Sequence, residues 1–336
     1  MKDFDPLEKE RQLQHESGAW DTSVVAPANA GDIPVIDVGR YFDTDSDEEL
    51  EKVAVQLHDA CTQVGFFSIV NHRLPIDSLL NVFDETRRFH DLPQATKNRL
   101  LMDRADWPVK GVGYLPVKNF KLPARNKGNL NESFIVKRDH KSTLNDSQWP
   151  VESELPAFRK NIETYASHIE ALAKRLLPIF ARALKLDKAY FSAAFSQALY
   201  RLRMTRYPLV PDKDRDEFGI APHVDTSFFT LLAQNSQGLV IYHEQRQCWI
   251  HAPVLENAFI VNTGELLKQW SNDYFISVKH FADNNTGQQM RYSVPFFFNA
   301  NADYLMACLP SCCDDNNPAK YPAISYLQSQ AIVQGE

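Results

Sequence analysis

Residues that could bind a metal ion are concentrated between positions 221 and 299. His223 and Asp225 are two residues apart, and His280 follows fifty-five residues after Asp225. Because residues i and i+2 of a strand point to the same face, a strand here would aim an imidazole and a carboxylate at one point. A later strand ending at His280 could supply a third ligand. Two histidines and one carboxylate with open coordination positions are typical of non-haem Fe(II) oxygenases, so the spacing predicts an Fe(II) site.

A second pair of polar residues follows the last of these histidines. Arg291 comes after ten intervening residues, and Ser293 lies two positions further on. The guanidinium fork matches a carboxylate bidentately, and the serine adds a hydroxyl beside it. A metal triad with such a carboxylate clamp nearby is what a chelating keto-diacid requires. A His-x-Asp sequence alone is common by chance in a chain with ten histidines, so the interpretation rests on the combined pattern.

With these motifs, the chain resembles the iron- and 2-oxoglutarate-dependent oxygenases of the isopenicillin N synthase-like family. The likeness covers roughly residues 32 to 326 and is carried by IPVIDVGRY, VGFFSIVNH, GVGYLP, RLRMTRYP, APHVDTSFFTLLAQN, GLVIY, VNTGELLKQWSND, KHFADN and RYSVPFFFNAN. The resemblance implies that His223, Asp225 and His280 bind iron. It also implies that Arg291, Ser293 and Tyr207 bind the co-substrate 2-oxoglutarate.

The activity implied by the resemblance is oxidation of a small-molecule metabolite, by hydroxylation, desaturation or cyclisation, with release of succinate and CO2. Fe(II) is the expected cofactor, 2-oxoglutarate and O2 are the expected co-substrates, and ascorbate is a candidate reductant. The sequence departs from the family at three positions. Thr205 stands where many relatives carry Asn, Arg206 where Tyr is frequent, and Phe281 where Arg is common. We therefore expect an altered pocket lining.

Five further residues are candidates for the walls of the substrate pocket. Arg206 could contact an acidic or carbonyl group of the substrate, unless it points to solvent or pairs with an acidic neighbour. Phe228 and Phe296 could exclude water, although about half of the side chains in an alternating strand should face the core. Glu132 and Phe134 lie in an irregular stretch that relatives present to the substrate, and a surface insertion is the alternative.

The periodicity of apolar residues indicates how these side chains are positioned. Helical periodicity marks 47–63, 76–90, 93–102 and 156–184, a strand is expected within 33–41, and a shorter helix at 186–195. Beyond position 199, short strands alternate with Gly, Pro and Asn turns, which is typical of a jelly roll. The predicted fold is mainly β with flanking helices (α+β). It has a double-stranded β-helix (jelly-roll) core, a helical N-terminal region and a long backbone helix.

Five segments are expected along the chain. Residues 1–31 form an N-terminal arm, 32–150 the N-terminal region of the non-haem dioxygenase family and 151–198 the backbone helices. Residues 199–302 form the jelly-roll core, and 303–336 form a C-terminal segment.

Composition limits the partners and the location of the protein. The chain carries 36 Lys and Arg against 43 Asp and Glu, a net charge of −7, and it has no basic run, which argues against a nucleic-acid partner. No apolar stretch approaches the ~18 residues of a membrane span. The charged start has no signal-peptide character, so a cytoplasmic location is expected. A monomer or weak dimer is also expected. The five cysteines, three of them in CLPSCC, are expected to be reduced thiols.

Two other functions remain open from the sequence. One is an oxidase of the same fold that ignores 2-oxoglutarate, because some relatives act in this way while keeping Arg-x-Ser. The other is a non-enzymatic jelly-roll binding module, in which His-x-Asp would be incidental and ferrous iron would be absent. His243 and His251 fit neither the triad nor its spacing and are expected to be structural or exposed.

Overall fold

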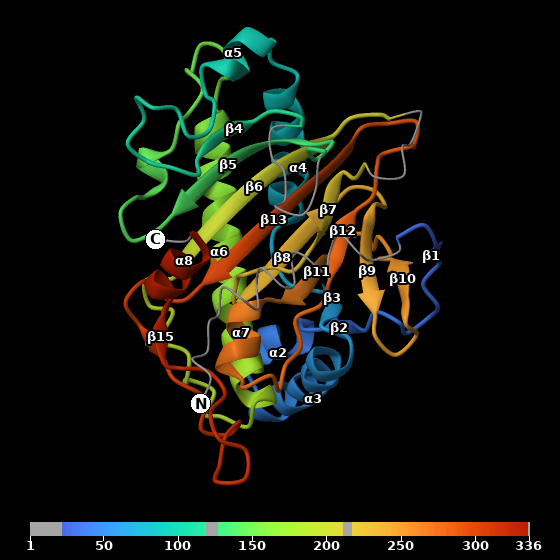
Figure 1. Ribbon diagram of the computed structural model, residues 1–336, viewed down its shortest axis with the longest axis vertical. Coiled ribbons are helices and arrows are strands. Elements are labelled where there is room, and N and C mark those ends of the chain that lie inside the picture. The colour runs from blue at the N-terminus through green and yellow to red at the C-terminus, as the bar shows by residue number, and fades with distance from the viewer. Residues whose placement is uncertain (1–21, 119–126, 211–216, 335–336) are drawn as a thin grey trace.

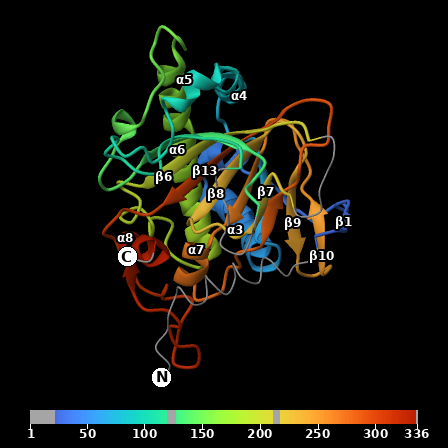
Figure 2. The same ribbon diagram turned by 45° about the horizontal axis from the view of Figure 1, so that its top comes forward.

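Two β-sheets face each other, and the predicted metal ligands lie between them. The computed structural model describes residues 22–118, 127–210 and 217–334, so most of the predicted N-terminal arm lies outside the described residues. Strands β7 to β13 supply four of the five strands of the smaller sheet and three of the eight strands of the larger one. Figures 1 and 2 show the helices grouped on one side of the sheets. The predicted fold class is confirmed.

The larger sheet has eight strands and draws them from both halves of the chain. Its N-terminal strands therefore join the sheet that carries the co-substrate clamp. In spatial order the strands are β2 (Val35–Asp37), β3 (Phe66–Val70), β11 (Phe259–Thr263), β8 (Phe229–Gln234), β13 (Arg291–Asn299), β6 (Leu199–Tyr207), β5 (Glu132–Arg138) and β4 (Gly113–Leu115).

The smaller sheet carries the two histidines of the predicted metal site. In spatial order its strands are β1 (Val25–Ala26), β10 (Cys248–His251), β9 (Leu239–His243), β12 (His280–Ala282) and β7 (Ile220–His223). A separate two-stranded sheet near the C-terminus consists of β14 (Leu305–Met306) and β15 (Ile324–Ser325).

Helices cover the face of the larger sheet that points away from the smaller one. Figure 1 shows α6 behind β6 and β13, and Phe180 of α6 stacks on Phe229 of β8 with ring centroids 4.9 Å apart. The helices are α2 (Gly39–Thr44), α3 (Asp47–Gln63), α4 (Ile76–His90), α5 (Gln94–Asn98), α6 (Phe158–Ala183), α7 (Glu265–Trp270) and α8 (Tyr326–Gln334), with a 3-10 turn at Leu144–Asp146. No helix within the described ranges is long and apolar enough to cross a membrane.

The long helices agree with their apolar periodicity, and three shorter predictions need correction. The strand expected at 33–41 ends at Asp37, whose Oδ1 accepts a hydrogen bond from the Gly39 N–H, and α2 follows. Helix α5 is shorter than the predicted 93–102. The helix expected at 186–195 is a series of turns, in which Tyr190 N–H donates to Asp187 O, three residues earlier.

Strand β13 of the larger sheet has one face toward the helices and one toward the pocket between the sheets. On β13, Phe296 and Phe298 belong to the main hydrophobic core, whereas Arg291, Ser293 and Phe297 line the pocket between the sheets. This alternation follows from the two-residue period of a strand. It decides which side chains can reach a bound ligand.

Candidate active site

His223, Asp225 and His280 come together between the two sheets. His223 and His280 are directly opposite each other on the antiparallel strands β7 and β12. The Nε2 atoms of both histidines lie 3.7 Å from Asp225 Oδ1, and the three ligand atoms all lie within 4.8 Å of one another. Two details of the prediction need correction. Asp225 lies beyond the end of β7 rather than on the strand, and His280 begins β12 rather than ending a strand.

Backbone carbonyl groups fix the orientation of both imidazole rings. His223 Nδ1 lies 2.8 Å from Ala221 O, and His280 Nδ1 lies 3.1 Å from Val278 O. Because a carbonyl oxygen only accepts, each Nδ1 must carry a proton, which leaves Nε2 as the nitrogen that can bind a metal. Both Nε2 lone pairs therefore point toward Asp225 Oδ1, which is the arrangement that a metal ion requires.

Two neutral side chains hold the Asp225 carboxylate. Thr230 Oγ1 donates to Asp225 Oδ2 at 2.7 Å, and Asn262 Nδ2 donates to the same oxygen at 2.8 Å. Oδ1 is thereby left facing the histidines. Sequence reasoning gave these two residues no role, because their positions depend on how β8 and β11 pair.

The charge states in the triad suit a cation. Burial raises the pKa of the Asp225 carboxyl, but the two imidazoles and the hydrogen bonds from Asn262 and Thr230 outweigh it, so the pKa lies below its ordinary value. Burial and the neighbouring His280 lower the pKa of His223. At neutral pH the site therefore offers one carboxylate and a neutral His223 imidazole, the forms that bind metal.

The predicted carboxylate clamp lies on β13 and β6. Arg291 is only 2% exposed, its guanidinium lies 4.3 Å from the Tyr207 ring centroid, and its Nη2 donates to Gln234 Oε1 at 3.1 Å. The hydroxyls of Tyr207 and Ser293 are 3.3 Å apart. Within the described residues, buried Arg291 Nη1 and Gln234 Nε2 have no hydrogen-bond partner. Unpaired buried donors of this kind fit a carboxylate that the protein alone does not supply.

The backbone of Gly238 lies directly against the Arg291 side chain. A Cβ atom at position 238 would be 2.5 Å from Arg291 Nε and 2.7 Å from its Cδ. The φ angle of Gly238 is +154°, which side chains of L-residues rarely adopt. A glycine is therefore required for Arg291 to occupy its observed position.

The triad and the clamp open into one pocket with about 540 Å³ of space not filled by atoms, part of it open to solvent. Both sheets contribute to the walls, and apolar side chains surround the polar groups. Besides the triad and its partners Thr230 and Asn262, the walls are formed by Phe66, Arg203, Tyr207, Ile220, Leu232, Leu239, Phe281, Ala282, Arg291, Ser293, Pro295 and Phe297.

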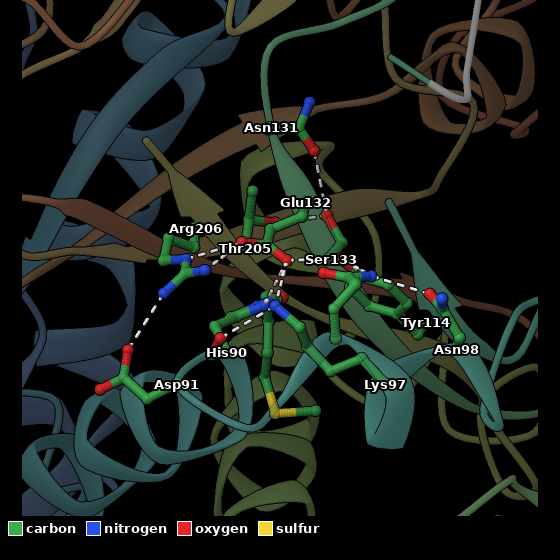
Figure 3. Close-up of polar contacts among 12 residues, drawn as sticks. His90, Asp91, Lys97, Asn98, Tyr114, Asn131, Glu132, Ser133, Thr205 and Arg206 are labelled. Atoms are coloured by element: carbon green, nitrogen blue, oxygen red, sulfur yellow. Dashed lines mark hydrogen bonds and ion pairs between the residues drawn. The ribbon is translucent and has the colours of Figure 1, made fainter. Parts of the chain in front are cut away.

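Two of the five predicted wall residues lie on the opposite face of the larger sheet. Glu132 and Arg206 belong to a buried charged group beneath the sheet, called here the Glu132 cluster, which Figure 3 shows. Arg206 Nε donates to Glu132 Oε1 at 2.7 Å, while Lys97 Nζ and the Tyr114 hydroxyl donate to Oε2 at 3.0 and 2.6 Å. His90 Nδ1 lies 3.5 Å from Oε2. Arg206 therefore pairs with acidic neighbours, the alternative considered for it above.

The three predicted phenylalanines also face the helices rather than the pocket. Phe134 packs against Phe89 with ring centroids 4.3 Å apart, and Phe228 packs against Phe195 at 4.7 Å. Phe296 belongs to the same hydrophobic core. All three are fully buried, so the prediction that they line the pocket was wrong.

Arg203 is a pocket residue that sequence reasoning missed. It lies on β6, four positions before Tyr207, and it shares the face of that residue because strand side chains alternate. Arg206, which was chosen instead, is one position from Tyr207 and hence on the other face. The even spacing from Tyr207 was the sequence signal that could have placed Arg203 on the pocket face.

Two family models match separate parts of the chain. Residues 33–152 match the family described as "non-haem dioxygenase in morphine synthesis N-terminal". Residues 196–300 match the "2OG-Fe(II) oxygenase superfamily". The second range contains the triad, the carboxylate clamp and Arg203.

Curated proteins and solved structures give similar matches. The 2-oxoglutarate-Fe(II) type oxidoreductase hxnY of Emericella nidulans is 30% identical over 307 residues, covering 87% of this chain and 86% of that protein. Azadirone synthase LFS of Melia azedarach is 29% identical over 297 residues, covering 83% and 87%. The crystal structure of a full-length Neurospora crassa protein in complex with alpha-KG superposes with a TM-score of 0.80 at 23% identity, covering 92% of this chain and 97% of that one.

Proposed function

Because the chain belongs to the 2-oxoglutarate-Fe(II) oxygenase superfamily, in its isopenicillin N synthase-like branch, we propose residue roles for the pocket between its two sheets. His223, Asp225 and His280 bind Fe(II), and Arg291, Ser293 and Tyr207 bind 2-oxoglutarate. The protein is a 2-oxoglutarate-dependent oxygenase that acts on a small metabolite. The observation that carries the proposal is the convergence in one pocket of three metal ligands and a buried arginine whose Nη1 has no partner within the described residues.

The ligand set fits ferrous iron. Two imidazole nitrogens with their lone pairs directed inward and one carboxylate oxygen supply three positions, which leaves the others open for co-substrate and oxygen. Hydrogen bonds from Thr230 and Asn262 prevent Asp225 from rotating away, and backbone carbonyls do the same for the histidines. The protein therefore prepares the site before the metal binds.

The carboxylate clamp fits a dicarboxylate co-substrate. The Tyr207 ring and Gln234 hold the Arg291 guanidinium in place, so its Nη1, which has no partner within the described residues, can bind a ligand at little entropic cost. Ser293 and Tyr207 add hydroxyl groups that can donate to a carboxylate. In this family the bound iron and 2-oxoglutarate supply the oxidising chemistry, with release of succinate and CO2. Leu232, Leu239 and the other apolar wall residues restrict water around it.

Iron binding is tested by anaerobic titration of the metal-free protein with Fe(II). Replacing His280 by Ala removes one of three ligands, so iron binding and turnover should be lost while the fold persists. His243 provides a matched control, because it is a buried histidine on β9 outside the triad, and His243→Ala should bind iron like the wild type. Full iron loading in His280→Ala would exclude this residue as a ligand.

Co-substrate binding is tested in Arg291→Gln, which should still bind iron. A charge-assisted hydrogen bond contributes roughly 1.5–3 kcal/mol, and loss of one partner from a buried ion pair costs about 3–5 kcal/mol. We therefore expect 2-oxoglutarate affinity to fall on the order of tenfold to a thousandfold or more. Unchanged affinity would assign the clamp to another residue, and substrate oxidation without succinate would favour the oxidase alternative.

Two further expectations stay predictions. They are a cytoplasmic location and a monomeric or weakly dimeric state. Size-exclusion chromatography with light scattering would test the second, and a stable dimer at micromolar concentration would contradict it.

A further inference from the structure

Arg203 is a cation in the pocket wall that has no acidic partner within the described residues. Its Nε donates to Ser133 Oγ at 2.8 Å, and its Nη2 donates to Asn131 Oδ1 at 2.8 Å. Both acceptors are neutral, and no carboxylate of the described residues forms an ion pair with Arg203. Arg206, three positions along the same strand, pairs with both Glu132 and Asp91. Carboxylates therefore neutralise Arg206, whereas Arg203 on the same strand has only neutral hydrogen-bond partners within the described residues.

The hydrogen bonds of Arg203 hold it in place without neutralising it. Asn131 Nδ2 donates to Gly219 O at 2.6 Å, and Ser133 Oγ donates to Asn131 Oδ1 at 3.1 Å, so both acceptors are themselves fixed. The guanidinium has five N–H donors in a rigid fork, and two of them are used by these bonds. Burial lowers the pKa of Arg203 to about 10, which still leaves it charged at neutral pH. A fixed cation with spare donors therefore faces the pocket.

With Fe(II) and 2-oxoglutarate bound, the charges of the other groups in the pocket would cancel and leave that of Arg203 uncompensated. Ferrous iron carries two positive charges and Arg291 carries one, while Asp225 and a doubly charged 2-oxoglutarate together carry three negative charges. With neutral imidazoles these groups cancel. Arg203 is the remaining ionised group among the pocket-lining residues, so it adds one positive charge. Burying an uncompensated charge is costly, and an anionic ligand would remove that cost.

We propose that Arg203 binds a carboxylate on the prime substrate, and that this substrate is a small monocarboxylic acid with an apolar body. The proposal rests on the proposed function, because the same pocket must first bind iron and 2-oxoglutarate. Pro295 and Phe297, on the neighbouring strand β13, and Leu232 of β8 line the same pocket and can pack against the apolar body. Arg203 is thus a specificity-determining residue that selects charge, while these side chains select shape.

The test compares acids with their uncharged amides. The wild type loaded with Fe(II) and 2-oxoglutarate is kept anaerobic and titrated by calorimetry with benzoate, phenylacetate and butyrate, each against its carboxamide. At least one acid should bind on the order of tenfold to a hundredfold more tightly than its amide, because the carboxylate neutralises the guanidinium and the amide does not. Arg203→Gln should lose this preference, and Arg203→Lys should retain part of it.

Arg201 provides the matched control, because it lies two positions before Arg203 on β6, is exposed and does not line the pocket. Arg201→Gln should keep the full preference. The proposal is overturned if no acid binds the wild type better than its amide, or if the preference survives in Arg203→Gln. It is also overturned if Arg203→Gln weakens 2-oxoglutarate binding, because Arg203 would then belong to the co-substrate site. A wild type that binds iron and 2-oxoglutarate but shows no preference leaves the proposed function intact.

Discussion

Substitution of Gly238 by alanine should weaken 2-oxoglutarate binding indirectly, by displacing Arg291. The added Cβ would lie 2.5 Å from Arg291 Nε, 2.7 Å from its Cδ and 3.0 Å from its Cζ. Ordinary non-bonded contacts are about 3.5–4.0 Å, so the guanidinium must move by roughly 1 Å. A hydrogen bond of about 2.9 Å does not survive a displacement of that size.

The expected loss follows from the bond that is displaced. One charge-assisted hydrogen bond contributes roughly 1.5–3 kcal/mol, which corresponds to a tenfold to hundredfold increase in the dissociation constant of 2-oxoglutarate. Affinity is measured by anaerobic titration of the Fe(II)-loaded variant, and the free energy of unfolding by denaturant titration. Iron affinity should not change, because Gly238 is next to the clamp rather than the triad.

Gly31 allows the backbone effect to be separated from the contact with Arg291. Its φ angle is +91°, and a Cβ there would meet no atom within 4 Å. Gly31→Ala should therefore show the conformational cost of a positive φ angle, about 1–3 kcal/mol, with normal 2-oxoglutarate affinity. If Gly238→Ala binds 2-oxoglutarate like the wild type, the backbone contact does not position Arg291. If both variants lose affinity equally, the effect is general destabilisation.

Two further predictions concern the supports of the site and of the sheet. Asn262→Ala removes a hydrogen-bond donor to Asp225 Oδ2, so iron affinity should fall about tenfold to a hundredfold. A competition assay with a chelator measures this affinity, and an unchanged value would show that Thr230 alone can orient Asp225. Burial alone would raise the pKa of Glu132, but its partners in the Glu132 cluster lower that pKa well below the ordinary value of 4.5. The ionised carboxylate therefore stabilises the folded state above pH 4.5, and this contribution is lost as the pH falls. Glu132→Gln should lower the free energy of unfolding by about 3 kcal/mol at pH 7 and by less at pH 3, and an equal loss at both values would refute this electrostatic account.

The sequence was most informative where chemistry depends on residue type and spacing. The triad and the clamp were found because His223, Asp225, His280 and Arg291 form a pattern that few other functions share. The long helices were found because α3, α4 and α6 bury one face with a regular 3.6-residue period. These signals are local or need only the order of residues along the chain.

The wall residues could not be found in this way, because they depend on which face of a strand is turned inward. In β13 the run from Val294 to Phe298 is apolar throughout, since one face meets the helices and the other lines the pocket. Such a run contains no alternation from which to choose a face. In β6 the polar residues at 201, 203 and 205 do alternate, and together with Tyr207 they would have identified Arg203.

The separation of the two faces of the larger sheet has a consequence for how this protein can diversify. Residues that line the pocket, such as Arg203 and Phe297, are not the residues that pack against the helices, such as Phe296 and Phe298. Mutations can therefore alter what the pocket accepts while leaving the packed core intact. A lineage with this arrangement can explore new metabolites by single substitutions at alternate positions, because neither the packed core nor the metal ligands need to change.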